Sequence, residues 1–323
     1  MFQALKKVDV NHQLVRNLNR AWPKRATVCA VDKFQVEDAF DASKPDYPTC
    51  MVPFFSHPKF QKLPPEVQSA VLTWGWIGYN RRTVSAEENV VNPALAVIST
   101  NFLSKNEWHF KEAMQQTLID EHYHTLMHMK AVERTKAERN ISIELELPPS
   151  VTYRRLLALH QEFDAPWQKD LVSIAFAVVA EISVNAYLDM LAADTSIQPQ
   201  NRRVAELHNR DEYAHSKVVA EIGKVMYANM DTKNRQFFVC MLPQALHAFV
   251  AQDYSMWEAI LHQLGVVDTQ EIISDTRAAA AGGVIMRDYS GLHCFASELG
   301  ILNEIDFDFT GTLKAVEADT LSH

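Results

Sequence analysis

The chain has 323 residues, of which 47% are apolar and 22% charged, and it carries a formal net charge of −9 with a pI of about 5.8. This balance is typical of a globular protein with a substantial core, and the acidic charge argues against nucleic acid or an anionic membrane as a partner. Only 9 glycines occur, which disfavours all-β folds and glycine-looped nucleotide sites, because both need many flexible turns.

Residues 1–62 are expected to wrap around a surface, because one helix over 12–22 is followed by the prolines Pro45, Pro48, Pro53 and Pro58. Helical periodicity then predicts four helices of about 25 to 35 residues, over 65–101 with an interruption near Pro93, 106–140, 164–193 and 202–229. Globular helices average about 11 or 12 residues, so this length is typical of a four-helix bundle. Shorter helices are expected at 233–252, 255–264, 269–281 and 288–299, with Gly282-Gly283 between the last two.

The predicted fold is therefore all-α, a single domain over 1–323 with an N-terminal wrap (1–62), a four-helix core (63–230) and C-terminal peripheral helices (231–323). The N-terminus, MFQALKKVDVNHQ, lacks the apolar centre of a signal peptide. The longest nearly apolar run, 171–180, ends at Glu181 and falls short of the 18 or more residues of a membrane span. Four scattered cysteines form no CxxC motif. We expect a cytoplasmic protein with reduced thiols.

Two copies of one pattern carry the chemistry. Asp-Glu-x-x-His occurs once in the second and once in the fourth long helix, as Asp120-Glu121-His122-Tyr123-His124 and Asp211-Glu212-Tyr213-Ala214-His215. These are the only two Glu-x-x-His pairs in the sequence, and helical rotation puts each Glu and His within about 60° of one another. Di-iron carboxylate bundles take such a pair from each of two helices and one glutamate from each of the other two, since iron binds carboxylate and imidazole ligands.

The other two helices should each supply one glutamate. Glu181 interrupts an otherwise apolar face, and a lone buried carboxylate costs several kcal/mol unless it is paired or bound to metal. On the first helix the pattern leaves Glu87 and Glu88 open. Asp120 and Asp211 are expected to accept an N–H from a ligating histidine of the opposite motif. Ordinary ion pairs on solvated faces, or a structural buried pair at Glu181, are the alternatives.

Three further sets of side chains are interpreted more simply. His208 lies on the same arc as Glu212 and His215, but pattern alone leaves it either a ligand or a helix-face histidine. His122 faces away from the motif pair, and His128 is expected to be structural or to support a ligand. Core packing is the simplest interpretation of the large apolar side chains near the motifs, Trp74, Trp76, Phe102, Met127 and Met129.

The chain resembles a known family, the p-aminobenzoate N-oxygenases, which are non-haem di-iron enzymes with a ferritin-like fold. The resemblance spans about residues 20 to 309 and includes RAWPKRA (20–26), VPFFSHPKF (52–60), WIGYN (76–80), NPA (92–94), DEHYHTLMHM (120–129), AEISVN (180–185) and LHNRDEYAH (207–215). It implies a ligand set in which Glu87 is chosen over Glu88 and His208 is a ligand: Glu87, Glu121, His124, Glu181, His208, Glu212 and His215.

The resemblance also implies the activity. It predicts an O2-dependent monooxygenase that oxidises an amine nitrogen to hydroxylamine, nitroso or nitro product in secondary-metabolite (antibiotic) biosynthesis, with a p-aminobenzoate-like arylamine as the substrate. Two Fe ions, O2 as co-substrate, an external electron donor (a redox partner or chemical reductant) and a homodimer come with it. Tyr79, Arg82 and Asn185 are the predicted substrate-binding residues. Arg82 is interpreted either as a clamp for a substrate carboxylate or as a structural ion-pair partner.

Other functions stay open at this point. The same site could oxidise an amino-acid-derived or pyrazine amine, or carry out another di-iron oxidation such as hydroxylation or desaturation. A tyrosyl radical is a further possibility, because Tyr123 and Tyr213 adjoin the motifs. Iron storage would need an oligomeric shell and an acidic nucleation surface, which the sequence does not display.

Overall fold

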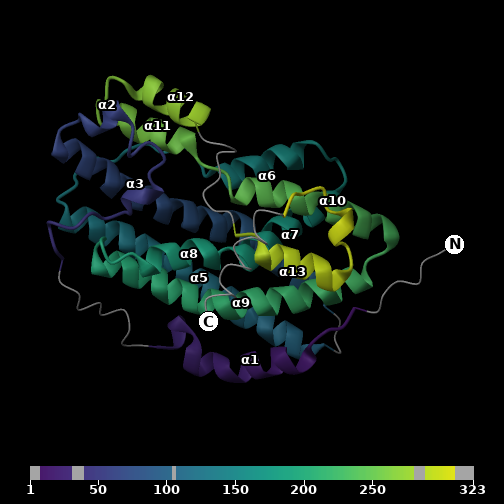
Figure 1. Ribbon diagram of the computed structural model, residues 1–323. Helices are drawn as coiled ribbons and strands as arrows, with labels where there is room; N and C mark the ends of the chain where they lie inside the picture. The colour runs from purple at the N-terminus through teal and green to yellow at the C-terminus, as the bar shows by residue number, and fades with distance from the viewer. Residues whose placement is uncertain (1–7, 31–39, 104–106, 280–287, 310–323) are drawn as a thin grey trace, which may run out of the picture.

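The computed structural model describes residues 8–30, 40–103, 107–279 and 288–309, and within these ranges all regular structure is helical (Figure 1). The elements that make up the four rods of the core are α3 (Pro65–Ala86), a π-helical turn η3 (Glu87–Val91), α4 (Asn92–Asn101), α5 (Trp108–Glu138), α7 (Pro166–Ser183), α8 (Asn185–Ala193) and α9 (Pro199–Asn229). The peripheral elements are α1 (His12–Arg25), η1 (Thr27–Cys29), η2 (Thr49–Met51), α2 (Pro58–Gln61), α6 (Val151–Gln161), α10 (Thr232–Phe249), α11 (Tyr254–Gln263), α12 (Thr269–Ala279), α13 (Ser290–Leu299) and η4 (Leu302–Glu304).

Four long helical rods form the core of the bundle: α3–η3–α4, α5, α7–α8 and α9. α3 packs on α5, α5 on α9, α9 on α7, and α4 closes the ring against α7. The smaller helices cover this core, with α1 along α5 and α9, α10 against α7, and α11 against α3 (Figure 1). The all-α prediction with a four-helix core and peripheral helices is confirmed.

Prolines and short polar side chains set where the helices begin. Pro65, Pro166 and Pro199 occupy the first turns of α3, α7 and α9, where a missing N–H costs nothing because the first N–H groups of a helix have no partner within it. The Ser150 hydroxyl accepts from Tyr153 N at the start of α6, a helix that the sequence analysis left unassigned. The Gly282-Gly283 boundary lies outside the described residues.

The first long helix differs from expectation by a widened turn. Pro93 has no N–H to donate, and Asn92 N donates instead to the carbonyl of Glu87, five residues earlier. This is the hydrogen bond of a π-helix, a form that recurs at functional sites. The third predicted helix is likewise divided, since α7 ends at Ser183 and α8 begins at Asn185. Both irregularities lie within four residues of a predicted ligand, Glu87 or Glu181.

Two apolar cores occupy the two ends of the bundle. One gathers the N-terminal part of α5 (Phe110, Met114), most of α7 and the C-terminal part of α9. The other gathers α3, the middle of α5 (Met127, Ala131) and the start of α9. Along α5 and α9 the two motifs fall between these cores. The bundle therefore encloses a layer of polar side chains between two layers of hydrocarbon.

One stretch, Pro166–Ala193, is long and apolar enough to cross a membrane, with a mean hydropathy of 1.9. The search for uninterrupted apolar residues did not identify this stretch, because Glu181 ends the run. The mean hydropathy does identify it, because there Glu181 is averaged with its apolar neighbours. The mean hydropathy is that of an 18-residue window within this stretch, and 72% of that window is buried in the bundle, as expected of a core helix.

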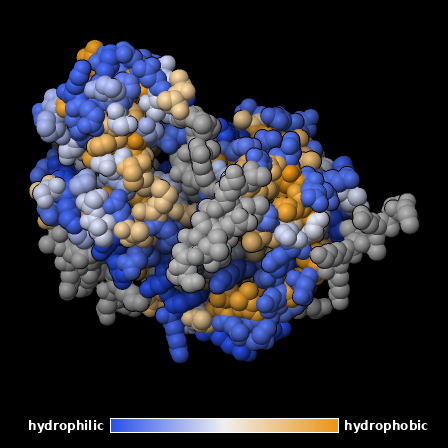
Figure 2. Space-filling view, viewed as in Figure 1, coloured by the Kyte–Doolittle hydropathy of each residue, from blue (hydrophilic) through white to orange (hydrophobic). Residues whose placement is uncertain are grey.

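The surface in view in Figure 2 is mostly hydrophilic, with apolar side chains in scattered groups. On α5 the outward face carries Ile119, Leu126 and Met129, and Met129 is 49% exposed. Its assignment to the core was wrong. Met127 and Met129 are two residues apart, hence about 200° apart around the helix, so only one of them can face inward.

Gly291 provides a test of the packing of α13 on α7. A Cβ built at Gly291 would collide with the backbone carbonyl of Ile182, one residue past Glu181. Gly291→Ala is therefore expected to lower the free energy of unfolding by about 1–3 kcal/mol, the usual cost of overpacking. Ser297→Ala, on the exposed side of α13, is the matched control and should change stability by less than about 0.5 kcal/mol. Urea denaturation measures both, and a more stable Gly291→Ala protein, as helix propensity alone predicts, would contradict this packing.

Candidate metal centre

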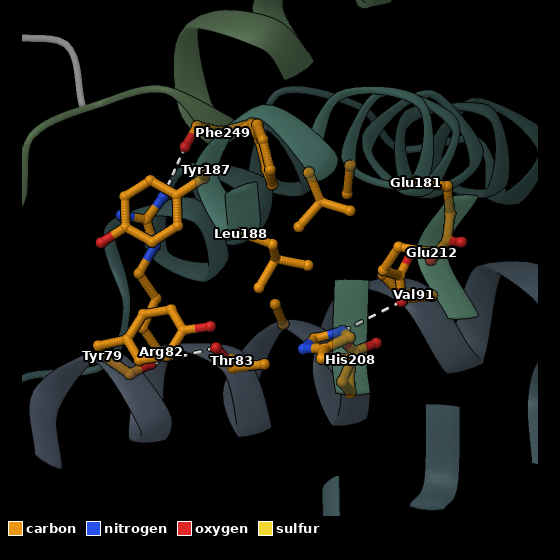
Figure 3. Close-up of a pocket in the computed structure, with 14 residues that line it drawn as sticks. Tyr79, Arg82, Thr83, Val91, Glu181, Tyr187, Leu188, His208, Glu212 and Phe249 are labelled. Carbon is orange, nitrogen blue, oxygen red and sulfur yellow. Dashed lines mark hydrogen bonds and ion pairs between the residues drawn. The ribbon is translucent and has the colours of Figure 1, made fainter. Parts of the chain in front are cut away.

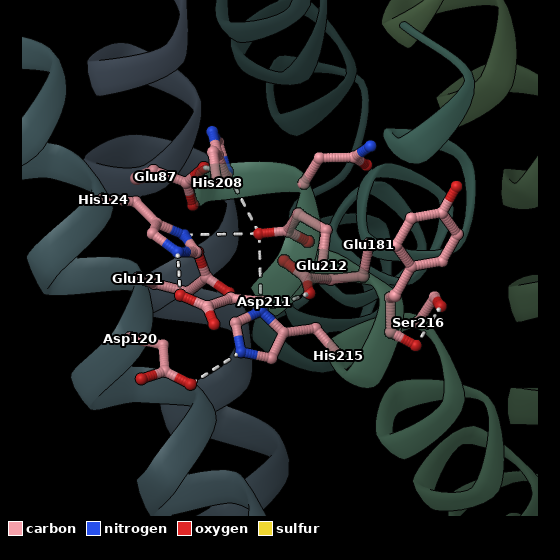
Figure 4. A network of polar contacts seen from close by, with 12 residues as sticks. Glu87, Asp120, Glu121, His124, Glu181, His208, Asp211, Glu212, His215 and Ser216 are labelled. Carbon is pink, nitrogen blue, oxygen red and sulfur yellow. Dashed lines mark hydrogen bonds and ion pairs between the residues drawn. The ribbon is translucent and has the colours of Figure 1, made fainter. Parts of the chain in front are cut away.

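Seven side chains from four helical rods meet in the polar layer (Figure 4). Glu87 comes from η3, Glu121 and His124 from α5, Glu181 from α7, and the remaining three from one face of α9: His208, Glu212 and His215. All seven are at least 94% buried. Of the two glutamates that the pattern left open, the π-helical turn points Glu87 inward and leaves Glu88 exposed.

Six of the seven side chains form two overlapping clusters. Ligand atoms of the first group, Glu121, His124, Glu212 and His215, all lie within 4.8 Å of one another, and so do those of the second, Glu87, Glu121 and His208. Glu121 belongs to both. Glu212 Oε1 lies 3.0 Å from His208 Nε2 and 3.3 Å from His124 Nδ1. Glu181 approaches from the α7 side, 3.9 Å from His215 Nδ1. Carboxylate and imidazole groups gathered in this way are a donor set suited to metal ions.

The negative charge of this layer has no basic counterpart. Among the described residues, none of the four glutamates forms an ion pair with a lysine or arginine, and each of them pairs with histidine alone. The oxygens Glu87 Oε2, Glu181 Oε2 and Glu212 Oε2 are buried without a hydrogen bond. Buried carboxylates in this state are costly unless a proton or a metal ion neutralises them. Four carboxylates match the charge of two divalent cations.

Burial and the neighbouring charges shift the pKa values of the glutamates and histidines of this layer in opposite directions. Burial, together with the nearby charges of Glu121 and Glu212, raises the pKa of Glu87 and of Glu181 well above the usual range. Burial also opposes ionisation of Glu212, but contact with His215 and hydrogen bonds from His124 and His208 hold its pKa well below that range. For His124 and His215 burial is outweighed by Glu121, which raises both pKa values.

Each motif aspartate contacts the histidine of the opposite motif. Asp120 Oδ2 lies 3.0 Å from His215 Nε2, and Asp211 Oδ2 lies 3.3 Å from His124 Nε2 (Figure 4). Both histidines therefore present Nδ1 to the cluster. The N-terminal segment completes the arrangement, since Trp22 Nε1 donates to Asp120 (2.9 Å) and the backbone N–H of Thr27 donates to Asp211 (3.0 Å). These partners orient the imidazole rings and fix which nitrogen faces the metal.

A cavity opens beside the cluster, and Figure 3 shows its two unlike ends. It encloses about 580 Å³, including its open mouth. Glu181, His208 and Glu212 stand at one end, and Tyr79, Arg82 and Tyr187 at the other. The walls between them are apolar: Ala86, Val91, Ala180, Val184, Leu188 and Phe249. The mostly apolar lining, with polar groups at both ends, suits a small organic ligand.

The polar end of the cavity has free hydrogen-bonding capacity. Arg82 Nη2 donates to the carbonyl of Phe249 (2.5 Å), and among the described residues Arg82 forms no ion pair. The Tyr79 hydroxyl is buried without a hydrogen-bond partner. Burial and the neighbouring Tyr187 raise its pKa above the usual range, so it is a neutral donor.

The third predicted substrate residue lies elsewhere. Asn185 Nδ2 donates to Asn209 Oδ1 (2.8 Å), and Asn185 is not among the residues that line the cavity. The prediction counted one helical turn from Glu181, but the helix is divided at Val184 and that relation is lost. Sequence reasoning missed Tyr187 and Phe249, which line the cavity. Tyr187 lies six residues after Glu181 on an apolar face that includes Val184, a spacing that could have found it; Phe249 has no such signal.

Comparison with known proteins agrees with this geometry. The sequence profile of the family described as P-aminobenzoate N-oxygenase AurF matches residues 9–300. A relative from Streptomyces thioluteus, named 4-aminobenzoate N-oxygenase, is 38% identical over 296 residues, which cover 90% of this chain and 88% of the relative. The matched range contains the positions of all seven residues of the buried cluster. The chain belongs to the p-aminobenzoate N-oxygenase AurF family, and it is an oxygenase with a ferritin-like, all-α fold and a buried metal site.

Proposed function

We propose that this chain uses two iron ions and O2 to oxidise the nitrogen of an arylamine. The observation that carries the proposal is the layer of four buried glutamates without basic partners, interleaved with three histidines and open to a cavity. The proposed ligands are Glu87, Glu121, His124, Glu181, His208, Glu212 and His215. The two irons, when bound, activate O2 and are returned to the ferrous state by an external electron donor.

In this proposal the protein orients the imidazole rings of the ligands and positions the amine. Asp120 and Asp211 fix the rings of His215 and His124, so that each offers a nitrogen lone pair to the cluster. The apolar cavity walls exclude bulk water from the reacting amine and position it beside Glu181, Glu212 and His208.

The cavity suits an arylamine that carries a carboxylate at the other end. Flat apolar walls accept the ring, and Arg82, which has no carboxylate partner of its own among the described residues, would bind the acid. The Tyr79 hydroxyl would add a second donor. The name of the Streptomyces thioluteus relative, 4-aminobenzoate N-oxygenase, points to the same substrate class. Hydroxylamine, nitroso or nitro compounds in a secondary-metabolite pathway are the proposed products.

We extend the proposal to the assembly. The whole chain is taken as one domain that acts as a cytoplasmic homodimer, with a redox partner or chemical reductant supplying electrons. Gel filtration with light scattering tests this: a dimer agrees with it, whereas a large hollow assembly would favour iron storage instead.

The reaction itself is tested by mixing anaerobic, ferrous-loaded protein with O2 in a stopped-flow spectrometer. A transient visible absorption that decays faster with p-aminobenzoate is expected if the amine is the substrate, because its oxidation would use the oxygen that the metal site activates. Unchanged decay with p-aminobenzoate but faster decay with an aliphatic or pyrazine amine would redirect the substrate assignment. A stable tyrosyl radical signal would contradict N-oxygenation.

The carboxylate clamp predicts a selective effect of Arg82→Leu. Loss of charge-assisted hydrogen bonds worth about 1.5–3 kcal/mol should raise KM for p-aminobenzoate about 10- to 150-fold. Aniline, which has no carboxylate, should be affected little. Arg81→Leu is the matched control, because Arg81 pairs with Glu144 and donates to the Leu145 carbonyl away from the cavity. Equal losses with both substrates would assign Arg82 a structural role.

Metal loading should depend on pH in a defined direction. Because the pKa values of Glu87, Glu181, His124 and His215 are raised, each of these groups keeps its proton to a higher pH than usual. Ligands must lose these protons to bind metal. Binding of two ions is therefore expected to release up to four protons, and affinity should fall as pH is lowered. Calorimetry in two buffers of different ionisation enthalpy counts the protons, and no release would contradict the protonation pattern.

A further inference from the structure

His208 differs from the other two histidines of the cluster in how it is held. His124 and His215 present Nδ1 to the glutamates and hold an aspartate at Nε2. His208 is turned the other way, with Nε2 at 3.0 Å from Glu212 Oε1 and 3.9 Å from Glu87 Oε1. Its Nδ1 lies 2.9 Å from His128 Nε2, so its partner is a second imidazole and not a carboxylate.

His128 and its own partner come from two other helices. His128 lies on α5 and its Nδ1 is 2.7 Å from Oδ1 of Asn80, which lies on α3. Both residues are fully buried. Asn80 Nδ2 in turn donates to the carbonyl of Trp76 at 2.7 Å. Three rods of the bundle are thus linked by one line of hydrogen bonds that ends at the metal cluster.

The donor and acceptor of each hydrogen bond in this line can be assigned by starting from the Trp76 carbonyl. The Trp76 carbonyl can only accept, so the amide group of Asn80 that faces it must be the NH2 group. Asn80 therefore turns its oxygen to His128, which must donate from Nδ1–H. Among the described residues His128 forms no ion pair, and a buried cation without a counter-ion is costly. A neutral His128 has an unprotonated Nε2, which accepts from His208 Nδ1–H.

We infer that the Asn80–His128 pair is a positioning element that fixes His208 as the Nδ1–H tautomer and leaves its Nε2 lone pair for the metal. This rests on the proposed metal centre. It assigns a role to two buried polar side chains that neither line the cavity nor hydrogen-bond to the glutamates. Since the line contains no charge, it orients His208 without adding a negative group beside the cluster, unlike Asp120 and Asp211.

Zinc titration against a competing chelator tests the inference without any need for turnover. The wild type should bind two zinc ions. In His128→Phe the ring shape is kept but the acceptor is lost, so one of the two ions should bind about 10- to 100-fold more weakly and the other nearly unchanged. His128→Gln should restore the affinity, because its amide oxygen can accept from His208 and its NH2 group can donate to Asn80.

His160→Phe is the matched control for the same exchange. His160 is half-buried on α6, where its Nε2 contacts Ser173 Oγ at 3.0 Å, and it should leave both zinc affinities unchanged. Equal zinc binding by wild type and His128→Phe would overturn the positioning role and leave the metal centre intact. Failure of the wild type to bind two ions would overturn the metal centre and this inference with it.

A measurement on the unmutated protein keeps the inference falsifiable if a variant does not fold. In the zinc-loaded protein with ¹⁵N-labelled histidine, long-range ¹H–¹⁵N correlations distinguish a metal-bound Nε2 from a metal-bound Nδ1. The wild type is expected to show two histidines bound through Nδ1 and one bound through Nε2, the last with a retained Nδ1 proton. Three histidines bound through Nδ1 would overturn the assignment.

Discussion

Four buried glutamates lie between two layers of hydrocarbon, and among the described residues none of them pairs with a lysine or arginine. In a low-dielectric interior such a group of carboxylates repels itself and loses its hydration, so it persists only with protons or cations as partners. The apolar cores on either side supply the stability that tolerates this layer. The helices of the bundle hold the carboxylates in place, because each contributes a ligand from a rigid element packed at both ends.

The hydrogen bonds that orient the histidines extend from this layer to the helices that cover the bundle. The N-terminal helix and the turn after it reach the two motif aspartates through Trp22 and Thr27. Arg25 lies about 4 Å from both of these aspartates and offsets part of their charge. A segment that looked like a surface wrap is therefore connected to the metal ligands by two hydrogen-bond steps. Its packing on α5 and α9 contributes to the site as well as to the fold.

The π-helical turn and the division between α7 and α8 have the same consequence. Each interrupts a regular α-helix next to a glutamate. The cavity is lined from both places, by Ala86, Glu87 and Val91 on one side and by Glu181, Val184 and Tyr187 on the other. Irregular turns at functional positions are a frequent departure from ideal helix geometry.

Spacing along the chain was enough to predict the helical bundle and the candidate ligand pairs on α5 and α9, because both depend on intervals of three and four residues that a helix converts directly into a shared face. The sequence also singled out Glu181, since a charge within an apolar run needs a partner. Between Glu87 and Glu88 the periodicity was neutral, and only the resemblance favoured Glu87. Contacts between residues that lie far apart along the chain became visible only in the packed structure. Asn80, His128 and His208 meet from three helices, Phe249 reaches the cavity from α10, and Asn185 turns to Asn209. Such contacts depend on how whole helices pack, and no local spacing records them.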